Sequence, residues 1–471
     1  MPAVASKQDL ASILKTQRAN TRNMAATTAT QRRERIKRIE DYLTDEANRN
    51  RLVEALQKDF GKPEVETLTS EVGIVLTHAR YARKRLARWM KPKRVRTPLS
   101  LFGTTSHIRY EPKGQALIIS PWNYPVNLSL YPLIGAIAAG CTVVLKPSEV
   151  TQHTSAYMRD MLSDLFPPEE VSVVLGEAEV SQELTAMPFN HIFFTGSPAV
   201  GKKVMAAAAK NLASVTLELG GKSPCIVDET ANLGQVVDRI VWAKHFNCGQ
   251  TCIAPDYLLV HESQKEKLIG QYLKAIESFY GADPRKSKDY ARVVSEKHHQ
   301  RLSDLLEDAL DKGATILAGG QRDPESRYFA PTLVVDLLDN AELMHEEVFG
   351  PIMPLLTYRD LDEAIRFIND RPKPLTLYMM SRSRTHIKRV LNQTSAGGTL
   401  INELLLGYAN PELPFGGVNN SGIGKSFGHH GFLEFSNERS VLRRRFLDLK
   451  MIYPPYPEKK LKLVRWLHKK L

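Results

Sequence analysis

One cysteine carries the strongest chemical signal in this chain of 471 residues. Cys252 ends the run Phe-Asn-Cys-Gly-Gln-Thr-Cys, in which a glycine-containing turn follows a helix-like segment and precedes a strand-like one. Such a turn can aim a side chain into a cleft, so this thiol is a candidate nucleophile in a chain with four cysteines. Glu218 lies upstream, in Leu-Glu-Leu-Gly-Gly-Lys. A thiol and a distant carboxylate together suggest covalent catalysis with a general base.

Other interpretations compete for the same cysteine. An isolated cysteine is more often a small core residue than a nucleophile. Cys248, Cys252 and His245 have the side chains of metal ligands, but their spacing is unusual and no fourth ligand cluster accompanies them. We therefore expect no metal. A regulatory disulfide between Cys248 and Cys252 would need their Cα atoms to lie within about 7 Å.

Strand-like apolar segments alternate with helix-like segments in two series. The first series covers 116–120, 142–146, 171–175, 191–195 and 214–219, and the second covers 253–261, 331–337, 352–358, 376–381 and 398–402. Continuous apolar strands separated by helices predict a parallel, doubly wound sheet. We therefore predict the α/β class, with a Rossmann-like nucleotide-binding domain followed by a second α/β domain that has Cys252 at its start.

The flanking segments have different patterns. Residues 8–60 are predicted to be helical, and apolar residues at three- and four-residue steps predict one long helix over 66–90, which Pro92 ends. Residues 94–112 and 430–450 are predicted to be extended. These two segments can pair as a small β bridging region.

The turn after the strand over 191–195 suits a nucleotide cofactor. It contains Thr195, Gly196, Ser197 and Gly201, and a helix follows. Glycines at a strand-to-helix turn let backbone amides approach a phosphate. The spacing differs from Gly-x-Gly-x-x-Gly, so an ordinary turn is an equally good interpretation of this motif alone.

Polar side chains also follow the two preceding strands. Lys146 and Glu149 stand where such folds bind ribose hydroxyls, and an acidic residue there favours a free 2′-hydroxyl over a phosphate. Asn123 follows the first strand in Ser-Pro-Trp-Asn-Tyr-Pro. Its amide, with a backbone N–H, can stabilise an oxyanion. The alternative is an asparagine that serves the turn before Pro125.

Composition places the chain among ordinary globular proteins. Hydrophobic residues make up 42% and charged residues 25%, and the length suffices for two or three domains. Four cysteines are too few for a disulfide framework, which indicates a reducing, cytoplasmic compartment. We expect no secretory signal, and no apolar run reaches the ~20 residues of a membrane span.

The formal net charge of +12 is unevenly distributed. Residues 80–96 contain nine Lys or Arg and no acidic residue, and residues 443–471 contain ten Lys or Arg. Nucleic acid, anionic lipid and plain solvation can each account for such patches. No basic motif interleaved with aromatic residues appears, so we do not expect nucleic-acid binding.

The tail over 451–471 is basic and amphipathic. In a helix its apolar residues would share one face: Leu461, Val464, Leu467 and Leu471. Trp466 would lie near the boundary, which is the composition of an interfacial helix. Loose peripheral attachment to an anionic membrane and a solvated or subunit-docked tail are equally good interpretations.

Several motifs occur in the order seen in aldehyde dehydrogenases. They are Pro-Trp-Asn-Tyr-Pro around Asn123, Thr195-Gly196-Ser197, Leu-Glu-Leu-Gly-Gly-Lys around Glu218, Gly-Gln-Thr-Cys ending at Cys252, residues 346–351, Asn402 and residues 414–417. The chain resembles this family from about residue 8 to 445. The short N-terminus and the Gly-Gln-Thr-Cys-Ile-Ala-Pro-Asp-Tyr run most resemble class 3, which includes fatty and aromatic aldehyde dehydrogenases.

The resemblance implies NAD(P)-dependent oxidation of a lipophilic aldehyde (fatty, aromatic or isoprenoid) to the carboxylic acid. Cys252 would attack the aldehyde, Asn123 and the Cys252 N–H would hold the oxyanion, and Glu218 would activate the water that hydrolyses the thioester. NAD is the expected cofactor, with NADP also accepted, and a homodimer is expected. The residues implied at the cofactor are Trp122, Lys146, Glu149, Thr195, Gly196, Ser197, Gly201, Glu347 and Phe349.

The resemblance also divides the chain into domains. The expected parts are an NAD(P)-binding domain (1–93 and 113–218), a catalytic domain (219–400), bridging and oligomerisation strands (94–112 and 430–450) and the basic tail (451–471). A coenzyme A-acylating enzyme is the nearest rival, but such enzymes are expected to lack a carboxylate like Glu218. A non-catalytic, membrane-binding protein that retains the fold is disfavoured by the intact Cys252, Glu218 and Asn123.

Two residues depart from the family pattern. Asn419 stands where the family usually has glycine, and because asparagine tolerates positive φ we expect the turn to survive. Cys248 stands where class 3 relatives commonly have serine. Catalysis remains plausible with a cysteine there, which adds a candidate oxidation partner.

Overall fold

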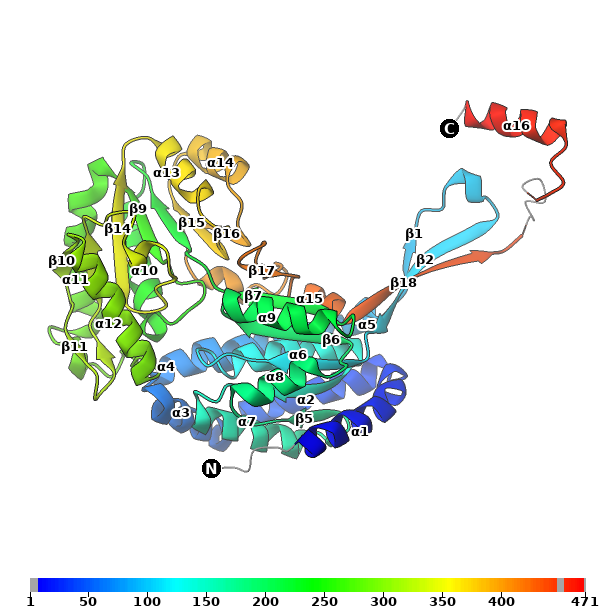
Figure 1. Ribbon diagram of the computed structural model, residues 1–471, viewed down its shortest axis with the longest axis horizontal. Coiled ribbons are helices and arrows are strands. Elements are labelled where there is room, and N and C mark those ends of the chain that lie inside the picture. Colours follow the sequence, from blue (N-terminus) through cyan, green and yellow to red (C-terminus); the bar gives the residue numbers. More distant parts are fainter. Residues whose placement is uncertain (1–6, 447–452, 470–471) are drawn as a thin grey trace.

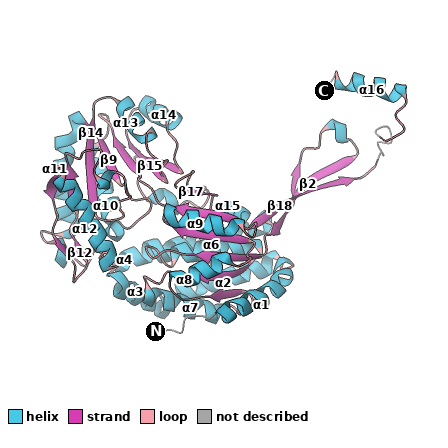
Figure 2. Cartoon of the chain, viewed as in Figure 1, coloured by secondary structure: helices cyan, strands magenta, loops and turns pink. Residues whose placement is uncertain are grey.

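The computed structural model describes residues 7–446 and 453–469. Figure 1 shows two lobes side by side, each built around a sheet, and a narrow arm that projects from one of them. Helices flank the strands of both lobes (Figure 2). This arrangement confirms the predicted α/β class with two α/β lobes and a small β region.

The first lobe contains a six-stranded sheet. Its strands are β3 (Gln115–Ile119), β4 (Thr142–Lys146), β5 (Val171–Val173), β6 (His191–Gly196), β7 (Ser214–Leu219) and β17 (Gly422–Ile423), in the order β17-β7-β6-β3-β4-β5. The five predicted strands are present and parallel. The antiparallel edge strand β17 was not predicted, because two residues show no detectable hydrophobic period.

Helices cover the first sheet on both sides. They are α1 (Lys7–Ala25), α2 (Ala29–Thr44), α3 (Glu46–Phe60), α6 (Asn127–Ala139), α7 (Gln152–Leu165), α8 (Ala178–Ala186) and α9 (Pro198–Ala209). The first three confirm the helical prediction for residues 8–60. Ser197 begins α9 as its N-cap, with its hydroxyl accepting from the Val200 N–H at 3.4 Å.

The long helix predicted over 66–90 is present with one irregularity. It runs as α4 (Glu64–Glu66), a π-helical segment (Thr67–Gly73) and α5 (Ile74–Trp89). A π-helical turn often marks a functional region. Glu71 lies in this segment, fully buried, and its carboxylate accepts from Lys62 Nζ at 2.9 Å and from the Asn127 N–H at 2.8 Å. The buried pair therefore ties the long helix to the start of α6.

The second lobe contains a seven-stranded sheet in the order β10-β13-β14-β9-β8-β15-β16. Its strands are β8 (Pro224–Val227), β9 (Tyr257–His261), β10 (Thr315–Ala318), β13 (Thr332–Val335), β14 (Ile352–Tyr358), β15 (Thr376–Met380) and β16 (Gly398–Ile401). Its helices are α10 (Leu233–His245), α11 (Lys265–Tyr280), α12 (Glu296–Asp311), α13 (Leu361–Asn369) and α14 (Arg384–Gln393). A small hairpin, β11 (Arg322–Asp323) and β12 (Tyr328–Phe329), lies beside this sheet.

The sequence predictions for this lobe contain one wrong strand boundary and miss two strands. The strand predicted over 253–261 begins only at Tyr257, because Pro255 cannot donate to a ladder and the residues around it form a turn. β8 and the antiparallel strand β10 were not predicted. The other four strands lie within or match the predicted segments.

The arm consists of β1 (Lys93–Val95), β2 (Thr104–Pro112) and β18 (Ser436–Arg444). β2 and β18 pair antiparallel from Ser436 opposite Pro112 to Arg444 opposite Thr104, which confirms that the two predicted extended segments pair. The extended prediction was wrong for residues 430–435. They fall mainly in α15 (Gly428–Glu434), because Phe432 and Phe435 bury their rings against the first lobe. Residues 447–450 lie outside the described part.

The C-terminal helix α16 (Glu458–His468) lies beyond the end of the arm (Figure 1). Leu461, Val464 and Trp466 are exposed on it. Leu471 and the side chain of Leu467, which complete the predicted apolar face, lie outside the described residues. In the described ranges, no helix has both the length and the apolar character needed to cross a membrane.

Candidate active site

The predicted site residues meet where the first sheet faces the second lobe. Ile119 pairs with both Lys146 and Phe194, and Thr195 pairs with Glu218, so the strands end level with one another. The residues that follow them therefore share one edge. A cavity of about 510 Å³, the strand-end cavity, lies there. Most predicted residues line it: Trp122, Asn123, Thr195, Gly196, Ser197, Glu218, Cys252, Glu347 and Phe349.

A left-handed turn presents Cys252. After α10, the φ values of Asn247, Cys248 and Gly249 are 56°, 55° and 73°. Residue 249 must be glycine, because a Cβ there would lie 2.2 Å from the carbonyl oxygen of Gly350. The turn brings Cys252 to the boundary of two cavities, the strand-end cavity and a second, apolar one.

Amide side chains hold this turn in place. Gln250 Nε2 donates to the Asn247 carbonyl at 3.0 Å, and Gln250 Oε1 accepts from the Val294 N–H at 2.8 Å. Asn123 Nδ2 donates to the Gln250 carbonyl at 3.1 Å, while Asn247 Nδ2 donates to the Asn123 carbonyl at 3.0 Å. The buried Asn123 amide is thus fixed beside the loop that carries Cys252. This is the position that an oxyanion donor needs.

Glu218 is a buried carboxylate with one oxygen left free. Its Oε1 accepts a hydrogen bond from Ser426 Oγ at 2.8 Å, and its Oε2 has no hydrogen-bond partner among the described residues. Burial raises the pKa of Glu218 to about 8, against the opposing effects of the Ser426 hydroxyl and the Lys425 ammonium group. The nearby Glu434 carboxylate raises the pKa further. A carboxyl with this pKa can take a proton near neutral pH.

The two cysteines of the loop have different surroundings. Cys252 packs against the core of the first lobe, whereas Cys248 belongs to the core of the second and its thiol donates to the Tyr290 hydroxyl at 3.7 Å. Both thiols are free, so the structure contains no disulfide between them. Burial raises the pKa of Cys248 to about 12, and this thiol lines neither the strand-end cavity nor the apolar cavity. Burial, with the Glu347 and Glu218 carboxylates, also raises the pKa of Cys252.

The apolar cavity opens on the other side of Cys252 and has a volume of about 160 Å³. Aromatic and aliphatic side chains dominate its lining: Leu128, Trp242, Phe246, Tyr408, Phe415 and Phe427. A cavity of about 150 Å³ holds a benzene molecule. This cavity can therefore hold the apolar part of a small substrate while its reactive carbon meets the thiol.

Aromatic rings and a carboxylate also line the strand-end cavity. The Phe349 ring lies edge-on to the Trp122 ring at 5.3 Å, and the His298 ring lies 4.8 Å from that of Trp122. The Glu347 carboxylate lies against Gly220, where an added Cβ would come within 1.9 Å of its Oε2. Burial raises the pKa of Glu347 to about 8.

Three predicted cofactor residues do not line this cavity. Lys146 Nζ donates to Glu149 Oε2 at 2.5 Å just beyond the end of β4, beside the strands that carry the site. Gly201 packs α9 onto the sheet, because a Cβ there would lie 2.7 Å from Leu219 Cδ2. The structure therefore gives Gly201 a packing role between helix and strand.

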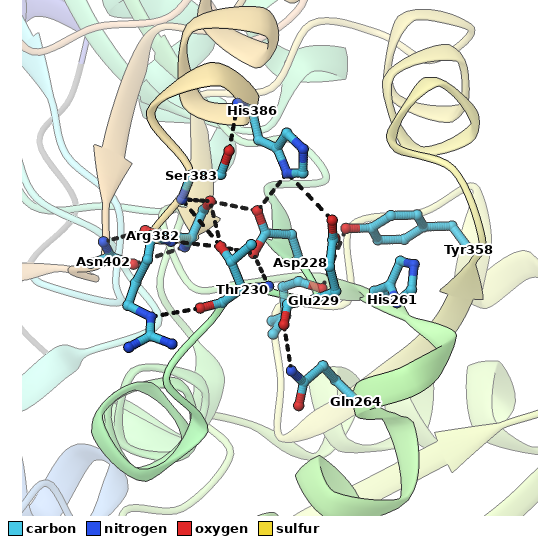
Figure 3. Close-up of polar contacts among 12 residues, drawn as sticks. Asp228, Glu229, Thr230, His261, Gln264, Tyr358, Arg382, Ser383, His386 and Asn402 are labelled. Carbon is cyan, nitrogen blue, oxygen red and sulfur yellow. Dashed lines mark hydrogen bonds and ion pairs between the residues drawn. The ribbon is translucent and has the colours of Figure 1, made fainter.

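A separate polar cluster lies at the ends of β8 and β15 (Figure 3). Asp228 accepts hydrogen bonds from the Ser381 hydroxyl at 2.5 Å, from His386 Nδ1 at 3.0 Å and from the Thr230 hydroxyl at 2.7 Å. Asn402 Oδ1 accepts from the Ser381 N–H at 2.9 Å. Protein donors already satisfy the Asp228 carboxylate, so the cluster braces the strand ends. Asn402, part of the family motif, belongs to this brace.

The turn with the unusual asparagine survives, as predicted. Asn419 has a φ of 55° and its Oδ1 accepts from Lys373 Nζ at 3.0 Å. The asparagine therefore adopts the left-handed conformation that glycine would supply.

The sequence prediction missed four residues that the structure brings to the site. Gln250 braces the cysteine loop, Ser426 contacts Glu218, and His298 and Arg301 of α12 line the strand-end cavity. His298 and Arg301 stand three positions apart on a helix, so both can face the cavity. No comparable signal marks Ser426, because a serine between two buried segments is common.

The sequence of this chain was compared with models of known protein families. Residues 2–441 match the model of the aldehyde dehydrogenase family. The chain belongs to this family. It is an aldehyde dehydrogenase, an oxidoreductase that uses NAD(P) to oxidise an aldehyde to the carboxylic acid. The resemblance stated from the sequence is thereby confirmed.

The relatives support class 3. The chain is 46% identical over 91% of its length to 4,4′-diaponeurosporen-aldehyde dehydrogenase of Staphylococcus aureus, covering 92% of that protein. It is 43% identical over 93% of its length to aldehyde dehydrogenase family 3 member B3 of Mus musculus, covering 91%. A substrate-bound structure of Staphylococcus aureus AldH matches with a TM-score of 0.93 and 43% identity, covering 98% of this chain and 99% of that one.

Proposed function

We propose that Cys252, Glu218 and Asn123 are the catalytic residues of this aldehyde dehydrogenase. The observation that carries the proposal is the position of Cys252 on both cavities, with Glu218 and Asn123 lining the same strand-end cavity. Trapping of an acyl group on Cys252 in Glu218→Gln, detected by peptide mass spectrometry, tests it.

The residues divide the reaction between them. The Cys252 thiolate adds to the aldehyde carbon, and the Asn123 amide with the Cys252 N–H stabilises the oxyanion of the thiohemiacetal. A thioester remains on Cys252 once the former aldehyde carbon has lost its hydride to the acceptor that NAD(P)⁺ would supply. Glu218 Oε2, which has no hydrogen-bond partner among the described atoms, takes a proton from the water that attacks the thioester. Breaking of the C–S bond then releases the acid and regenerates the thiolate.

The strand-end cavity fits a dinucleotide cofactor. The N-terminus of α9 at Ser197 offers backbone N–H groups for a diphosphate, and Gly196 leaves the backbone accessible. Trp122, Glu347 and Phe349 would contact the nicotinamide half. When bound, NAD(P)⁺ supplies the hydride acceptor. These three residues would hold the nicotinamide half in the cavity that Cys252 also lines.

Lys146 and Glu149 would bind the adenosine ribose, and Glu149 would favour NAD over NADP. Glu149→Gln should raise the ratio of kcat/KM for NADP⁺ to that for NAD⁺ by about tenfold, because it removes a charge that repels a 2′-phosphate. Initial rates with both cofactors measure the ratio. Glu179→Gln, at an exposed position of α8, is the matched control. An unchanged ratio of the two kcat/KM values in the Glu149 variant would show that Glu149 does not contact the cofactor.

We infer a lipophilic aldehyde as the substrate. Aromatic and aliphatic side chains dominate the lining of the apolar cavity, and the relatives include enzymes named for a diaponeurosporen aldehyde and for coniferyl aldehyde. An NADH-release screen over benzaldehyde and straight-chain aldehydes of increasing length tests the class. Preference for small hydrophilic aldehydes such as glyceraldehyde would contradict it.

We propose a cytoplasmic homodimer formed through the arm. The outer edge of β18 has no strand partner among the described residues, and Leu99, Phe102, Leu442 and Phe446 are exposed on the arm. Such an edge is normally covered. Sedimentation equilibrium should give twice the chain mass, and Leu442→Asp should give the chain mass. Leu212→Asp, at an exposed residue of the first lobe, should leave the dimer intact. A monomeric wild type would refute this proposal.

We propose that the basic tail attaches loosely to anionic membranes. Leu461, Val464 and Trp466 of α16 are exposed, and five Lys or Arg residues lie between 458 and 469. Full-length protein should co-sediment with phosphatidylglycerol vesicles at least about tenfold better than a chain ending at Tyr456, since each basic residue contributes about 1 kcal/mol. Phosphatidylcholine vesicles are the control. Equal binding by both chains would contradict the proposal.

A further inference from the structure

Glu66 is a buried carboxylate that the proposed reaction does not use. It ends α4, directly before the π-helical segment, and it lines neither the strand-end cavity nor the apolar cavity. Only 7% of its surface is exposed. Burial raises the pKa of Glu66 to about 7, against the opposing effects of the Lys62 ammonium group and the Asn247 N–H. Burying a carboxyl is unfavourable unless hydrogen bonds compensate for the lost water, so its hydrogen-bond partner indicates its role.

That partner belongs to the cysteine loop, residues 246–252. Glu66 Oε2 accepts a hydrogen bond from the Asn247 N–H at 2.9 Å, although the two residues lie 181 positions apart in the chain. Asn247 is fully buried, so its N–H needs an acceptor inside the protein. It is also the first of three consecutive residues with positive φ, followed by Cys248 and Gly249. The contact therefore fixes the point where the left-handed turn begins.

The turn needs a strong contact because its backbone is strained. Asn247 and Cys248 have φ values of 56° and 55°, and neither is glycine. Non-glycine residues in this conformation persist only where the surrounding structure holds them there. A carboxylate accepts a hydrogen bond more strongly than a neutral carbonyl does. The Glu66 carboxylate therefore stabilises the conformation that presents Cys252 to the cavities.

A second support for the loop begins next to Glu66. Lys62 Nζ lies 4.1 Å from the centre of the Tyr124 ring, and the hydroxyl oxygens of Tyr124 and Thr251 lie 2.6 Å apart. Thr251 directly precedes Cys252 in the chain. Glu66 thus contacts the start of the cysteine loop and Tyr124 contacts its end. The two contacts hold the loop at both ends.

The contact of Glu66 depends on an acceptor oxygen and not on an ion pair. Lys62 is the nearby cation that most lowers the pKa of Glu66, but its ammonium group pairs with Glu71 at 2.9 Å. Within the described ranges, Glu66 forms no ion pair of its own. An amide oxygen at the same place can accept the same N–H. Glu66→Gln should therefore preserve the position of the cysteine loop.

We propose that Glu66 is a positioning residue for the Cys252 thiol. Its carboxylate holds the Asn247 N–H, and the turn that starts there sets where the sulfur meets the aldehyde carbon. The inference rests on the proposed role of Cys252 as the nucleophile. Glu66 lines neither cavity, so its loss should slow thioester formation and leave cofactor binding intact. A displacement of a reacting group by about 1 Å can cost about 10²-fold in rate.

Single-turnover kinetics test the inference. With enzyme in excess over octanal and with saturating NAD⁺, the rate constant of NADH formation reports thioester formation without hydrolysis. Glu66→Ala and Glu66→Leu remove the acceptor, and each should lower this rate constant about 10- to 100-fold. Glu66→Gln should stay within about threefold of the wild type, because it keeps an acceptor oxygen. The Kd of NAD⁺, measured by isothermal titration calorimetry, should stay within about twofold in all three variants.

Asp59→Ala is the matched control. Asp59 is 8% exposed and accepts the backbone N–H groups of His153 at 3.0 Å and Thr154 at 2.9 Å, so it joins α3 to α7. Its substitution should lower the melting temperature, as Glu66→Ala does, but leave the rate constant of NADH formation within about twofold. Glu66→Leu keeps the space of the side chain filled, so it serves where Glu66→Ala does not fold.

The outcomes separate this role from the proposed function. Rate constants of Glu66→Ala and Glu66→Leu within about twofold of the wild type would overturn the positioning role, and so would an equal loss in Asp59→Ala. A loss in Glu66→Gln as large as that in Glu66→Leu would refute the acceptor oxygen as its cause. If the nucleophile assignment itself fails, Cys252→Ser will still form NADH in a single turnover, whatever the Glu66 variants do.

Discussion

Cys252→Ser should reduce aldehyde oxidation by at least about 10⁴-fold, because removal of a catalytic nucleophile has effects of this size or larger. A serine hydroxyl is a weak nucleophile unless a base lies next to it. NADH formation at saturating aldehyde and cofactor measures the loss. The protein should fold normally, since Cys252 sits in a turn at the cavity boundary and not inside a core.

Cys248→Ser is the matched control for this substitution. Cys248 has the same chemistry four residues away, but its thiol faces Tyr290 in the core of the second lobe. Replacement of Cys248 should leave kcat within about threefold of the wild-type value, because it changes the packing around residue 248 and leaves the Cys252 thiol intact. Large losses in both variants, or in Cys248→Ser alone, would contradict the assignment of the nucleophile.

Glu218→Gln should retain one burst of NADH per active site and lose about 10²- to 10⁴-fold in steady turnover. Acylation of Cys252 needs no water, so the first NADH forms; the thioester then persists because no base activates water. Stopped-flow absorbance of NADH separates the two phases. Coenzyme A should not restore turnover, whereas restoration would favour the acylating alternative. Full steady-state activity would refute the role of Glu218.

The pH dependence of the wild type follows from the same carboxyl. Burial raises the pKa of Glu218 to about 8, and only the ionised form can take a proton from water. The deacylation rate should therefore fall as the pH drops below about 8. Glu218→Gln should lack this dependence, because an amide does not titrate in this range.

Much of the fold was predictable because the strands have a strong local pattern. Strands β3, β4 and β6 each contain at least three consecutive buried apolar residues, β7 alternates apolar and polar residues, and the ends of these strands carry the motif residues. Parallel strands end at one edge, so Asn123, Thr195 and Glu218 had to approach one another. This topological rule allowed residues distant in the sequence to be assigned to one site.

The errors have local physical causes. The two residues of β17 and the half-exposed strand β10 show no reliable period. Gly428–Glu434 contains two glycines and two histidines, which obscure the helix that buried Phe432 stabilises. Ser426 could not be recognised, because its role depends on an oxygen 208 positions away in the sequence.

The proposed mechanism requires a covalent bond between the substrate and Cys252, and hydrolysis of that bond by water that Glu218 activates. Glu218→Gln incubated with octanal and NAD⁺, then digested and analysed by peptide mass spectrometry, tests this directly. We expect an octanoyl adduct on the peptide that contains Cys252, at the sulfur of that residue, with one acyl group per NADH formed. An acyl group on Cys248, or a burst of NADH without any acylated cysteine, would contradict it.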